Sequence, residues 1–456
     1  MLFNSFEFLV FFPLVAALFF ALPRGKWALL LAASCIFYGW FIPAYLAIMG
    51  AVIVVDYFAG RAIESAGTLR LRRIFLGVSL AANLGVLAVF KYYNFARENL
   101  DALGLGLPVL TMALPIGLSF HTFQAMSYII EVYRGHQKAE RHFGRYALYV
   151  MFFPQMVAGP IERPQNVLPQ LRDWRGFDED RVVSGLQRVL WGLVKKVIIA
   201  DRLAIVADAV FTDPAAHSGF GAWIGLYAFA VQIYCDFSGY SDIAIGTARV
   251  FGVKLMENFR QPYFACDLRE FWQRWHISLS TWFRDYVYIP FGGSRGSAAR
   301  TYRNVFLVFL LSGLWHGAAW TFVLWGAWHG AGTLVLMAWQ KVRGDTRATP
   351  LRRAIGWVLT FHFVVLGWIW FRAHSMAEAG ALWRALVDWS GPARPLPLDP
   401  MEAGIALLGV AVLLLGDAWR PRELTPPVRW ALYLAGGLAL IFLSPFGGKQ
   451  FIYFQF

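Results

Sequence analysis

NVFLVFLLSGLWHGAAWTFVLWGAWHGAGTLVLMAWQ, residues 304–340, contains no Asp, Glu, Lys or Arg. A helix that crosses a bilayer needs about 20 mostly apolar residues. The 37 residues of this run therefore predict two membrane-spanning helices joined by a turn. Other runs that lack the same four residue types are long enough for all or much of a further span: 8–23, 27–55, 74–90, 102–130, 214–235, 354–371, 403–416 and 430–448.

The composition of the 456-residue chain agrees with a protein built in a membrane. Hydrophobic residues make up 58% of it and charged residues 15%, whereas soluble proteins have about 45–50% and about 25%. The three cysteines lie in or beside apolar runs without a CxxC pair, so neither a disulfide framework nor a cysteine metal site is expected. These values exclude a disordered chain, a fibre and a disulfide-built secreted domain.

The net charge of +13 has two candidate sources, nucleic-acid binding and membrane topology. Lys and Arg are not gathered on one segment but lie between apolar runs, as in the cytoplasmic loops of membrane proteins. We therefore expect no nucleic-acid partner. If the basic loops 24–26, 61–73 and 134–145 are cytoplasmic, and if 27–55 crosses twice with a turn near 39–43, the N-terminus lies outside.

Two segments in the middle of the chain carry too many charges for simple spans. Residues 163–213 and 256–303 are expected to form interfacial or re-entrant helices, because polar irregular backbone at membrane depth is tolerated only inside protein. The stretch 271–288, FWQRWHISLSTWFRDYVY, mixes Trp with Arg and Asp, unlike a lipid-facing span. No repeat or separate soluble stretch is visible, so residues 1–456 are predicted to form a single all-α membrane domain.

Two histidines are the strongest candidates for chemistry. His316 lies in the longest uncharged run, beside Gly313 and Gly317, which allow close approach of a ligand or another helix. His276 lies 40 residues earlier, and the chain can return it to the same cavity. A neutral imidazole, with an unperturbed pKa of about 6.5, is a good proton acceptor in a dry site. The alternative is that either ring only bonds a backbone carbonyl and holds two helices together.

His329 follows His316 by 13 residues, about 20 Å along a continuous helix. The two rings can therefore meet only if the chain turns between them. We expect structural roles for His329, His121 and His362. No HExxH or Cys/His cluster, GxSxG elbow or P-loop occurs, so no metal site, serine nucleophile or nucleotide site is predicted.

A further polar group occurs in YCDFSGYSDIAIG, residues 234–246. Asp236, Ser238 and Tyr240 stand at the end of an apolar run, where they line a substrate channel or, alternatively, cap a helix end. ENFRQPY, residues 257–263, is open to the same two interpretations.

Together these strings resemble the membrane-bound O-acyltransferase superfamily, and within it the bacterial alginate O-acetyltransferase branch. The resemblance extends over the whole chain and rests on FFPQMVAGPIERP (152–164), DFSGYSDIAIG (236–246), ENFRQPY, FWQRWHISLSTWFRDYVYIPFGG (271–293), LSGLWHGAAWTFVLWGAWHG (311–330) and FIYFQF (451–456).

The resemblance implies a multi-pass protein of the bacterial inner membrane with roughly 11 transmembrane helices and additional interfacial or re-entrant ones. It makes His316, in the LWHG motif, the catalytic residue and His276 the second family histidine. The implied reaction passes an acetyl group from a cytoplasmic thioester, acetyl-CoA, across the membrane for O-acetylation of an exported polysaccharide such as alginate. Periplasmic or membrane-anchored partner proteins complete the transfer, and no cofactor is bound permanently.

The residues and the resemblance together give a mechanistic hypothesis. His316 deprotonates the acceptor hydroxyl or carries the acetyl group itself, while His276 assists. Four side chains near His276 are predicted to line the donor entrance: Trp272, Arg274, Trp275 and Arg284.

Two other functions are compatible with the same features. A branch of the same superfamily transfers D-alanine to teichoic acid from a carrier-protein thioester rather than from CoA. A transporter also uses intramembrane His and Asp for proton relays, but the paired broken helices of such folds are not visible in the sequence.

Overall fold

The computed structural model describes residues 1–111, 115–217, 219–344, 349–391, 394–397, 399–418, 426–443 and 451–452. In these ranges the regular secondary structure is helical, with no β-strand, as the all-α prediction required. The chain divides into two compact units, unit 1 (Met1–Gly192 and Tyr240–Met256) and unit 2 (Leu193–Gly239 and Glu257–Phe456). That residues 1–456 form one membrane domain stays a prediction.

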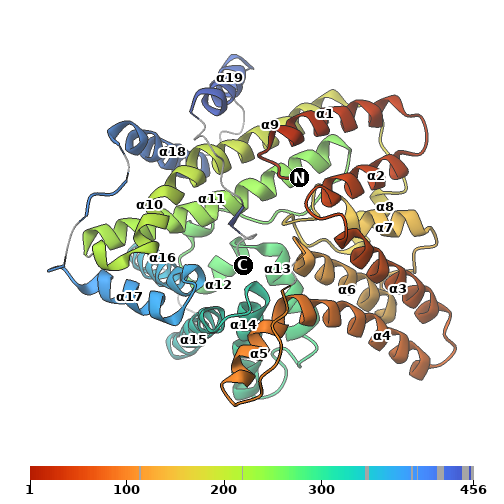
Figure 1. Ribbon diagram of the computed structural model, residues 1–456, viewed down its shortest axis with the longest axis horizontal. Helices are drawn as coiled ribbons and strands as arrows, with labels where there is room; N and C mark the ends of the chain where they lie inside the picture. The colour runs from red at the N-terminus through yellow and green to blue at the C-terminus, as the bar shows by residue number, and fades with distance from the viewer. Residues whose placement is uncertain are drawn as a thin grey trace. The chain divides into compact units, whose positions relative to one another are not determined.

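Unit 1 is a bundle of helices from the N-terminal part of the chain. Its elements are α1 (Phe6–Ala21), α2 (Lys26–Gly39), α3 (Tyr45–Ser65), α4 (Leu69–Leu87), the π-helix η1 (Ala88–Tyr92), α5 (Tyr93–Asp101), α6 (Leu118–Arg134), α7 (Phe143–Met151), α8 (Pro164–Gln170), nearly all of α9 (Glu179–Leu193) and the end of α11 (Phe220–Val250). Helices α3, α4 and α6 pack on one another, and α2 packs on α7 (Figure 1). The run 27–55 forms two helices, α2 and α3, with a break at 40–44, as predicted.

A buried carboxylate ties two helices of unit 1 together. Asp56 of α3 is fully buried and accepts hydrogen bonds from the Ser79 hydroxyl and the Asn83 amide of α4, at 2.5 and 2.9 Å. A buried carboxylate is tolerated only when such donors satisfy it. This contact fixes the pairing of α3 with α4.

Unit 2 holds the remaining helices. They are the π-helix η2 (Val194–Ala200), α10 (Asp201–Thr212), η3 (Pro214–Ala216), most of α11, η4 (Pro262–Phe264), α12 (Leu268–Arg274), α13 (Ile277–Phe283), the π-helix η5 (Arg284–Tyr288), α14 (Ala298–His316), α15 (Trp320–Arg343), α16 (Pro350–Arg372), α17 (Met376–Val387), α18 (Pro400–Ala418) and α19 (Pro426–Phe442). Helices α14 and α15 lie side by side, α15 packs on α16, and α16 packs on α17 (Figure 1).

The uncharged run 304–340 forms the predicted pair of helices. Helix α14 ends at His316, α15 begins at Trp320, and the turn occupies 317–319. The two helices approach closely because both contribute glycines. A Cβ atom on Gly313 would lie 2.2 Å from the Phe322 carbonyl oxygen, and one on Gly326 would lie 2.4 Å from the Phe309 carbonyl oxygen. No larger residue fits at either position without moving the backbone.

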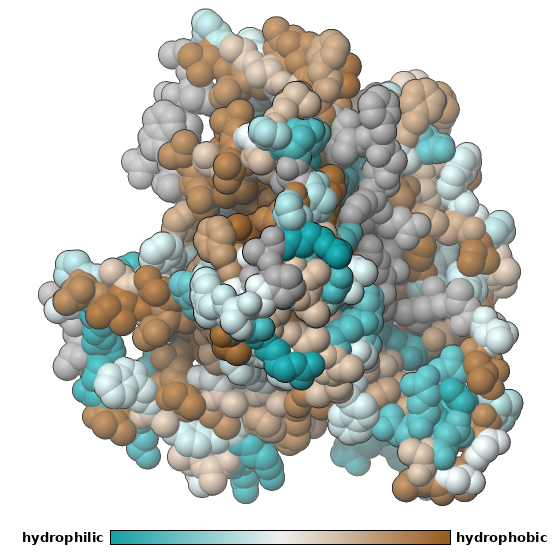
Figure 2. Space-filling view, turned by 60° about the vertical axis from the view of Figure 1, so that its left-hand side comes forward, coloured by the Kyte–Doolittle hydropathy of each residue, from teal (hydrophilic) through white to brown (hydrophobic). Residues whose placement is uncertain are grey.

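Five helices of the described residues are long and apolar enough to cross a membrane: Tyr45–Ser65, Leu69–Asp101, Phe220–Val250, Trp320–Arg343 and Pro350–Arg372. Four shorter apolar helices, Phe6–Ala21, Lys26–Gly39, Pro400–Leu415 and Trp430–Phe442, accompany them. Hydrophobic side chains cover much of the visible surface (Figure 2), as expected for a protein in contact with lipid. The predicted number of 11 spans is not confirmed.

The uncharged run 102–130 does not form the span that its length suggested. Its first part carries Gly104, Gly106 and Pro108 and is not helical, and α6 begins only at Leu118. Glycine and proline weaken helices, and α6 turns nearly all its side chains into unit 1, including the polar His121. An absence of charge was therefore not sufficient to identify a spanning helix.

The two charged middle segments differ in their helices. In 163–213, α9, η2 and α10 follow one another without a break from residue 179 to residue 212, whereas 256–303 consists largely of short pieces. Residues 256–303 contain α12, α13 and η5, with seven, seven and five residues. Their interfacial or re-entrant placement in a membrane stays a prediction.

Candidate functional site

His316 is the last residue of α14 and its side chain is buried in unit 2. Its imidazole lies among aromatic rings, with ring centroids 4.9 Å from Trp315, 5.0 Å from Trp325 and 5.2 Å from Phe371. These rings come from α14, α15 and α16, so three helices enclose the histidine. An environment of this kind excludes water from the ring.

The turn after His316 requires glycine. Gly317 has an extended backbone, and a Cβ atom there would lie 2.0 Å from the Phe322 ring. The sequence thus ends α14 directly after the histidine and starts α15 three residues later. His316 therefore stands at the end of a rigid helical hairpin, a placement that suits a precisely oriented functional group.

His276 reaches the same region from the irregular segment before α13. Its backbone is in the left-handed region, with φ 44°, which is uncommon for a residue other than glycine. Two backbone hydrogen bonds hold the segment: Ile277 N donates to Asn258 O at 2.9 Å, and Arg260 N donates to Arg274 O at 2.9 Å. Left-handed non-glycine residues cluster at functional sites, where the surrounding structure enforces them.

Asn258 determines which nitrogen of His276 carries the hydrogen. The Asn258 Oδ1 atom accepts a hydrogen bond from the Ser278 backbone N–H at 3.2 Å, so it must be the oxygen of the amide. His276 Nδ1 lies 3.2 Å from the same oxygen and must donate to it. Nε2 then carries the lone pair of the ring. Burial also lowers the pKa of His276 to about 3, so the imidazole is neutral at neutral pH.

The structure brings His276 and His316 together, with ring centroids 6.5 Å apart. Phe237 of α11 packs edge-on against His276 at 4.6 Å, and Trp315 lies 6.2 Å from it. Two imidazoles inside one aromatic enclosure can accept a hydrogen bond from, or relay a proton of, a bound hydroxyl group. They do not form a metal site with acidic or cysteine neighbours: the described residues contain no group of three or more His, Cys, Asp or Glu that could hold a metal ion.

His329 also joins this cluster. The chain turns between it and His316, and both rings contact Trp325, at 4.9 and 5.0 Å. Trp272 packs on the other side of the His329 ring at 4.9 Å. Neither ring nitrogen of His329 has a hydrogen-bond partner among the described residues. The structural role expected for His329 stays a prediction.

The four residues predicted to line the donor entrance occupy different surroundings. Trp272 contacts Trp325 at 5.7 Å, and the buried Trp275 contacts Trp368 at 5.0 Å, so both tryptophans build the aromatic enclosure. Arg274 forms an ion pair with Glu270 one helical turn away. Arg284 is mostly exposed and pairs with Asp285 at 2.8 Å. In the part of the chain that the structure describes, the ion pairs of both arginines are with these acidic neighbours and not with the histidines.

Asp236 is part of a buried charge cluster in unit 2. Lys196 of η2 lies 2.5 Å from Asp236 and 2.8 Å from Asp201, and the Ile452 backbone N–H donates to Asp236 at 2.7 Å. Burial lowers the pKa of Lys196, but the two carboxylates outweigh that effect and raise it above its usual value. Asp236 thus fastens a segment near the end of the chain beside Phe237, which contacts both Phe451 and His276.

The helix-capping interpretation of this motif is wrong, because Asp236, Ser238 and Tyr240 all lie inside the 31-residue helix α11. Ser238 is buried, and its hydroxyl has no hydrogen-bond partner among the described residues. Tyr240 belongs to unit 1, where its ring lies 4.6 Å from Phe3. Whether the three residues line a channel stays a prediction.

Sequence reasoning did not identify Asn258 and Lys196 as site residues. Asn258 acts through His276 and Lys196 through Asp236, partners that lie well apart from them in the sequence. No local spacing predicts such contacts. The sequence pattern did not predict the left-handed backbone conformation of His276 either. ENFRQPY, which was open to two interpretations, contributes the asparagine that orients a histidine.

Comparison with known proteins gives a consistent picture. The sequence model of the membrane-bound O-acyltransferase family matches residues 136–376, which include both histidines. A probable alginate O-acetylase of Pseudomonas putida is 39% identical over 100% of each chain, and one of Azotobacter vinelandii is 41% identical over 91% of this chain and 83% of its own. A peptidoglycan O-acetyltransferase of Helicobacter pylori is 34% identical over 79% of this chain and 74% of its own.

Proposed function

We propose that this chain, which belongs to the membrane-bound O-acyltransferase family, takes an acetyl group from acetyl-CoA and passes it on for O-acetylation of an exported polysaccharide, with His316 as the catalytic base. The chain is a multi-pass membrane O-acyltransferase. The donor, the immediate acceptor and the histidine roles are the proposal. The observation that carries it is the pair of buried imidazoles, 6.5 Å apart, inside an aromatic enclosure.

The proposed step is an acyl transfer to oxygen. His316 takes the proton from the acceptor hydroxyl, whose oxygen attacks the carbonyl carbon of the acetyl thioester. The new C–O bond forms as the C–S bond breaks, and the CoA thiolate leaves and is protonated. A neutral imidazole is suited to this step because it can accept a proton without first losing one. A dry cavity also limits hydrolysis of the thioester.

His276 has the supporting role. Its Nδ1–H is used by Asn258, so Nε2 is the hydrogen-bond acceptor of the ring. It can orient the acceptor hydroxyl or the protonated His316 without becoming charged, since its pKa is lowered to about 3. We assign it to positioning rather than to proton removal.

The transfer must end on the outer side of the membrane, because the polysaccharide is exported. We propose an inner-membrane location with the N-terminus outside, and periplasmic or membrane-anchored partner proteins that receive the acetyl group. The relatives named for acetylation of alginate and of peptidoglycan support such an acceptor. A reporter enzyme that works only in the cytoplasm tests this orientation when it is fused to the N-terminus. Activity of the fusion would contradict an N-terminus on the outer side.

The central test follows acetyl-CoA labelled in the acetyl group. Purified protein in vesicles, with a polysaccharide acceptor and periplasmic extract, is expected to release CoA and to transfer label to the acceptor. His316→Ala is expected to abolish both. His362→Ala is the matched control, because His362 is a histidine of α16 that bonds Tyr227 at 3.0 Å outside the cluster.

Each alternative has its own result. Full activity in correctly inserted His316→Ala protein overturns the base assignment, and stable label on the wild-type protein at a histidine indicates an acetyl carrier. Transfer from an acylated carrier protein but not from acetyl-CoA identifies the carrier-protein branch. Movement of an intact solute without thioester cleavage identifies a transporter.

A further inference from the structure

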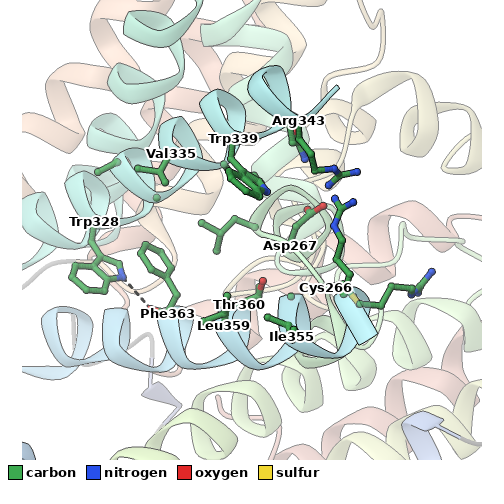
Figure 3. A pocket seen from close by; sticks show the side chains of 18 residues that line it. Cys266, Asp267, Trp328, Val335, Trp339, Arg343, Ile355, Leu359, Thr360 and Phe363 are labelled. Carbon is green, nitrogen blue, oxygen red and sulfur yellow. Dashed lines mark hydrogen bonds between the residues drawn. The ribbon is translucent and has the colours of Figure 1, made fainter. Parts of the chain in front are cut away.

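A cavity of about 710 Å³ opens between α15 and α16 in unit 2, with the segment 266–268 as its floor (Figure 3). It has the size of a ligand pocket, for which about 300–1,000 Å³ is typical. Its lining is mostly hydrophobic along its length: Leu268, Trp328, Ala331, Val335, Leu336, Trp339, Ile355, Leu359 and Phe363.

This cavity is separate from the histidine cluster. Trp328 and Phe363 close one end, where the Trp328 indole donates a hydrogen bond to the Phe363 carbonyl at 3.0 Å. The His329 ring lies beyond Phe363, with 5.7 Å between ring centroids. An occupant of the cavity therefore would not touch His316 or His276.

The walls of the cavity belong to two helices that are candidate membrane spans. Val335 of α15 is 69% exposed and Leu359 of α16 is 65% exposed. In a bilayer such side chains meet hydrocarbon, since water is absent at that depth. An apolar cavity stays dry, so its natural filling in a membrane is an acyl chain.

The opposite end of the cavity is basic. Arg343 is the last residue of α15, and Arg352 and Arg353 lie in the first turns of α16 (Figure 3 labels Arg343). One acidic side chain lines the same cavity: Asp267, which caps α12 by accepting from Glu270 N at 2.8 Å. Among the described residues of the lining, guanidinium groups therefore outnumber carboxylates by three to one. Guanidinium groups bind phosphate bidentately, and basic pockets between membrane helices bind anionic headgroups.

We propose that this cavity is a binding site for one anionic phospholipid. An acyl chain lies between α15 and α16 against Val335 and Leu359, and the phosphate is held by the arginines at the end of α15 and the start of α16. The site does not depend on the proposed histidine chemistry. Its occupant would stabilise the outer face of the hairpin that carries His316.

The test counts lipids that stay on the protein. Purified full-length protein is equilibrated with equal amounts of phosphatidylglycerol and phosphatidylcholine, and the lipids retained per molecule are measured by native mass spectrometry. We expect one phosphatidylglycerol to be retained in preference. The double variant Arg352→Ala/Arg353→Ala should lower this preference about 30-fold, since each basic side chain contributes about 1 kcal/mol to anionic lipid binding.

Two controls make the result specific. Arg295→Ala/Arg300→Ala removes the same charge from two exposed residues, one before α14 and one in its first turn, and should leave lipid retention unchanged. Ala331→Trp fills the cavity from an exposed position on α15 and should displace the lipid, whereas Ala338→Trp, also exposed on α15 but outside the lining, should not.

The outcome separates this site from the reaction. His316→Ala should retain lipid as the wild type does, so a failure of the acyltransfer proposal leaves this measurement intact. Equal retention of both lipids, or equal effects of the two arginine pairs, overturns the anionic-lipid site. Retention that survives Ala331→Trp overturns the placement of the acyl chain.

Discussion

Glu162 in unit 1 and His276 in unit 2 are both almost completely buried, and each is held by an asparagine, but their surroundings differ. Glu162 accepts from the Asn166 amide at 2.7 Å and from the Met256 backbone N–H at 2.5 Å. His276 bonds Asn258 on one side and faces aromatic rings and a second histidine on the other.

The difference concerns what each group is built to do. The Glu162 carboxyl joins α8 to the segment after α11 within unit 1, and both of its oxygens are used in that joint. His276 uses Nδ1 for support by Asn258, and its ring lies 6.5 Å from that of His316. Burial alone therefore does not identify a functional group. The partners of its polar atoms do, because a structural group uses all of them within the fold. The predictions below test this contrast.

The largest effect is expected at His316, the histidine next to His276. His316→Gln removes the proposed base but keeps a polar side chain of similar reach, so turnover should fall by about 10²–10⁴, the usual contribution of general base catalysis. The melting temperature in detergent should stay close to that of the wild type. Glu162→Gln serves as the comparison, and its turnover per folded molecule should match the wild type. A comparable loss in Glu162→Gln would break the contrast.

The next largest effect is on folding. Glu162→Ala removes the acceptor of the half-buried Met256 N–H, at about 1–3 kcal/mol for the unsatisfied group, and that of the Asn166 amide, which is exposed and can bond to water instead. We expect a clear drop in melting temperature and in the yield of folded protein, measured by fluorescence-detected size exclusion. The molecules that remain folded should transfer acetyl at the normal rate. Normal stability of this variant would show that the two hydrogen bonds accepted by Glu162 do not stabilise the fold.

Asn258 should affect rate more than stability. Asn258→Ala removes the acceptor that holds Nδ1–H, so His276 can rotate or change tautomer, and we expect kcat to fall about 10–100-fold with KM little changed. Asn258→Asp keeps an acceptor oxygen and should recover part of the rate.

A pH profile distinguishes positioning from simple packing at Asn258. The carboxylate in Asn258→Asp favours the protonated imidazole, so His276 should become charged at a higher pH than in the wild type. The acid limb of the activity profile should then move to higher pH. An unchanged profile together with full rescue would mean that Asn258 only fills space.

The smallest effects are opposite pH dependences of stability. Burial raises the pKa of Glu162 from 4.5 to about 7, so the folded state binds an extra proton and stability falls as pH rises through that window. Burial lowers the pKa of His276 from 6.5 to about 3, so stability falls as pH decreases from 6.5. Each slope approaches about 1.4 kcal/mol per pH unit.

These slopes are measured as differences between variants. As pH rises from 4.5 toward 7, the melting temperature of the wild type should fall relative to that of Glu162→Gln, because the amide does not titrate. In His276→Asn, the melting temperature should decrease less than in the wild type as pH falls below 6.5. Parallel curves for the wild type and either variant would contradict the corresponding assignment.

Much of the fold could be predicted from the sequence because helix pairs follow from local pattern. The run 304–340 gave a hairpin and 27–55 gave two helices, since uncharged length and a central glycine act over short distances. Pattern failed for 102–130, where an uncharged segment is coil and then an interior helix. Composition cannot distinguish side chains that face lipid from side chains that face protein.

Only part of the candidate site could be predicted from the sequence. The residue types at His276 and His316 indicated proton chemistry, and the structure places their rings near each other. The contacts that orient them, such as Asn258 on His276 and Lys196 on Asp236, are tertiary and have no local signature. Asp236 illustrates the limit: its position suggested a channel or a cap, but its carboxylate is used in a buried ion pair.

The close glycine packing of α14 and α15 has a consequence for biogenesis. The contacts made within this hairpin, of His316 with Trp325 and of Gly313 and Gly317 with Phe322, join residues a short distance apart along the chain. Contacts of low sequence separation form fast and need little of the remaining protein. The hairpin can therefore enter the membrane as one unit during translation and present its histidine already oriented, so that later helices assemble around a preformed half of the site.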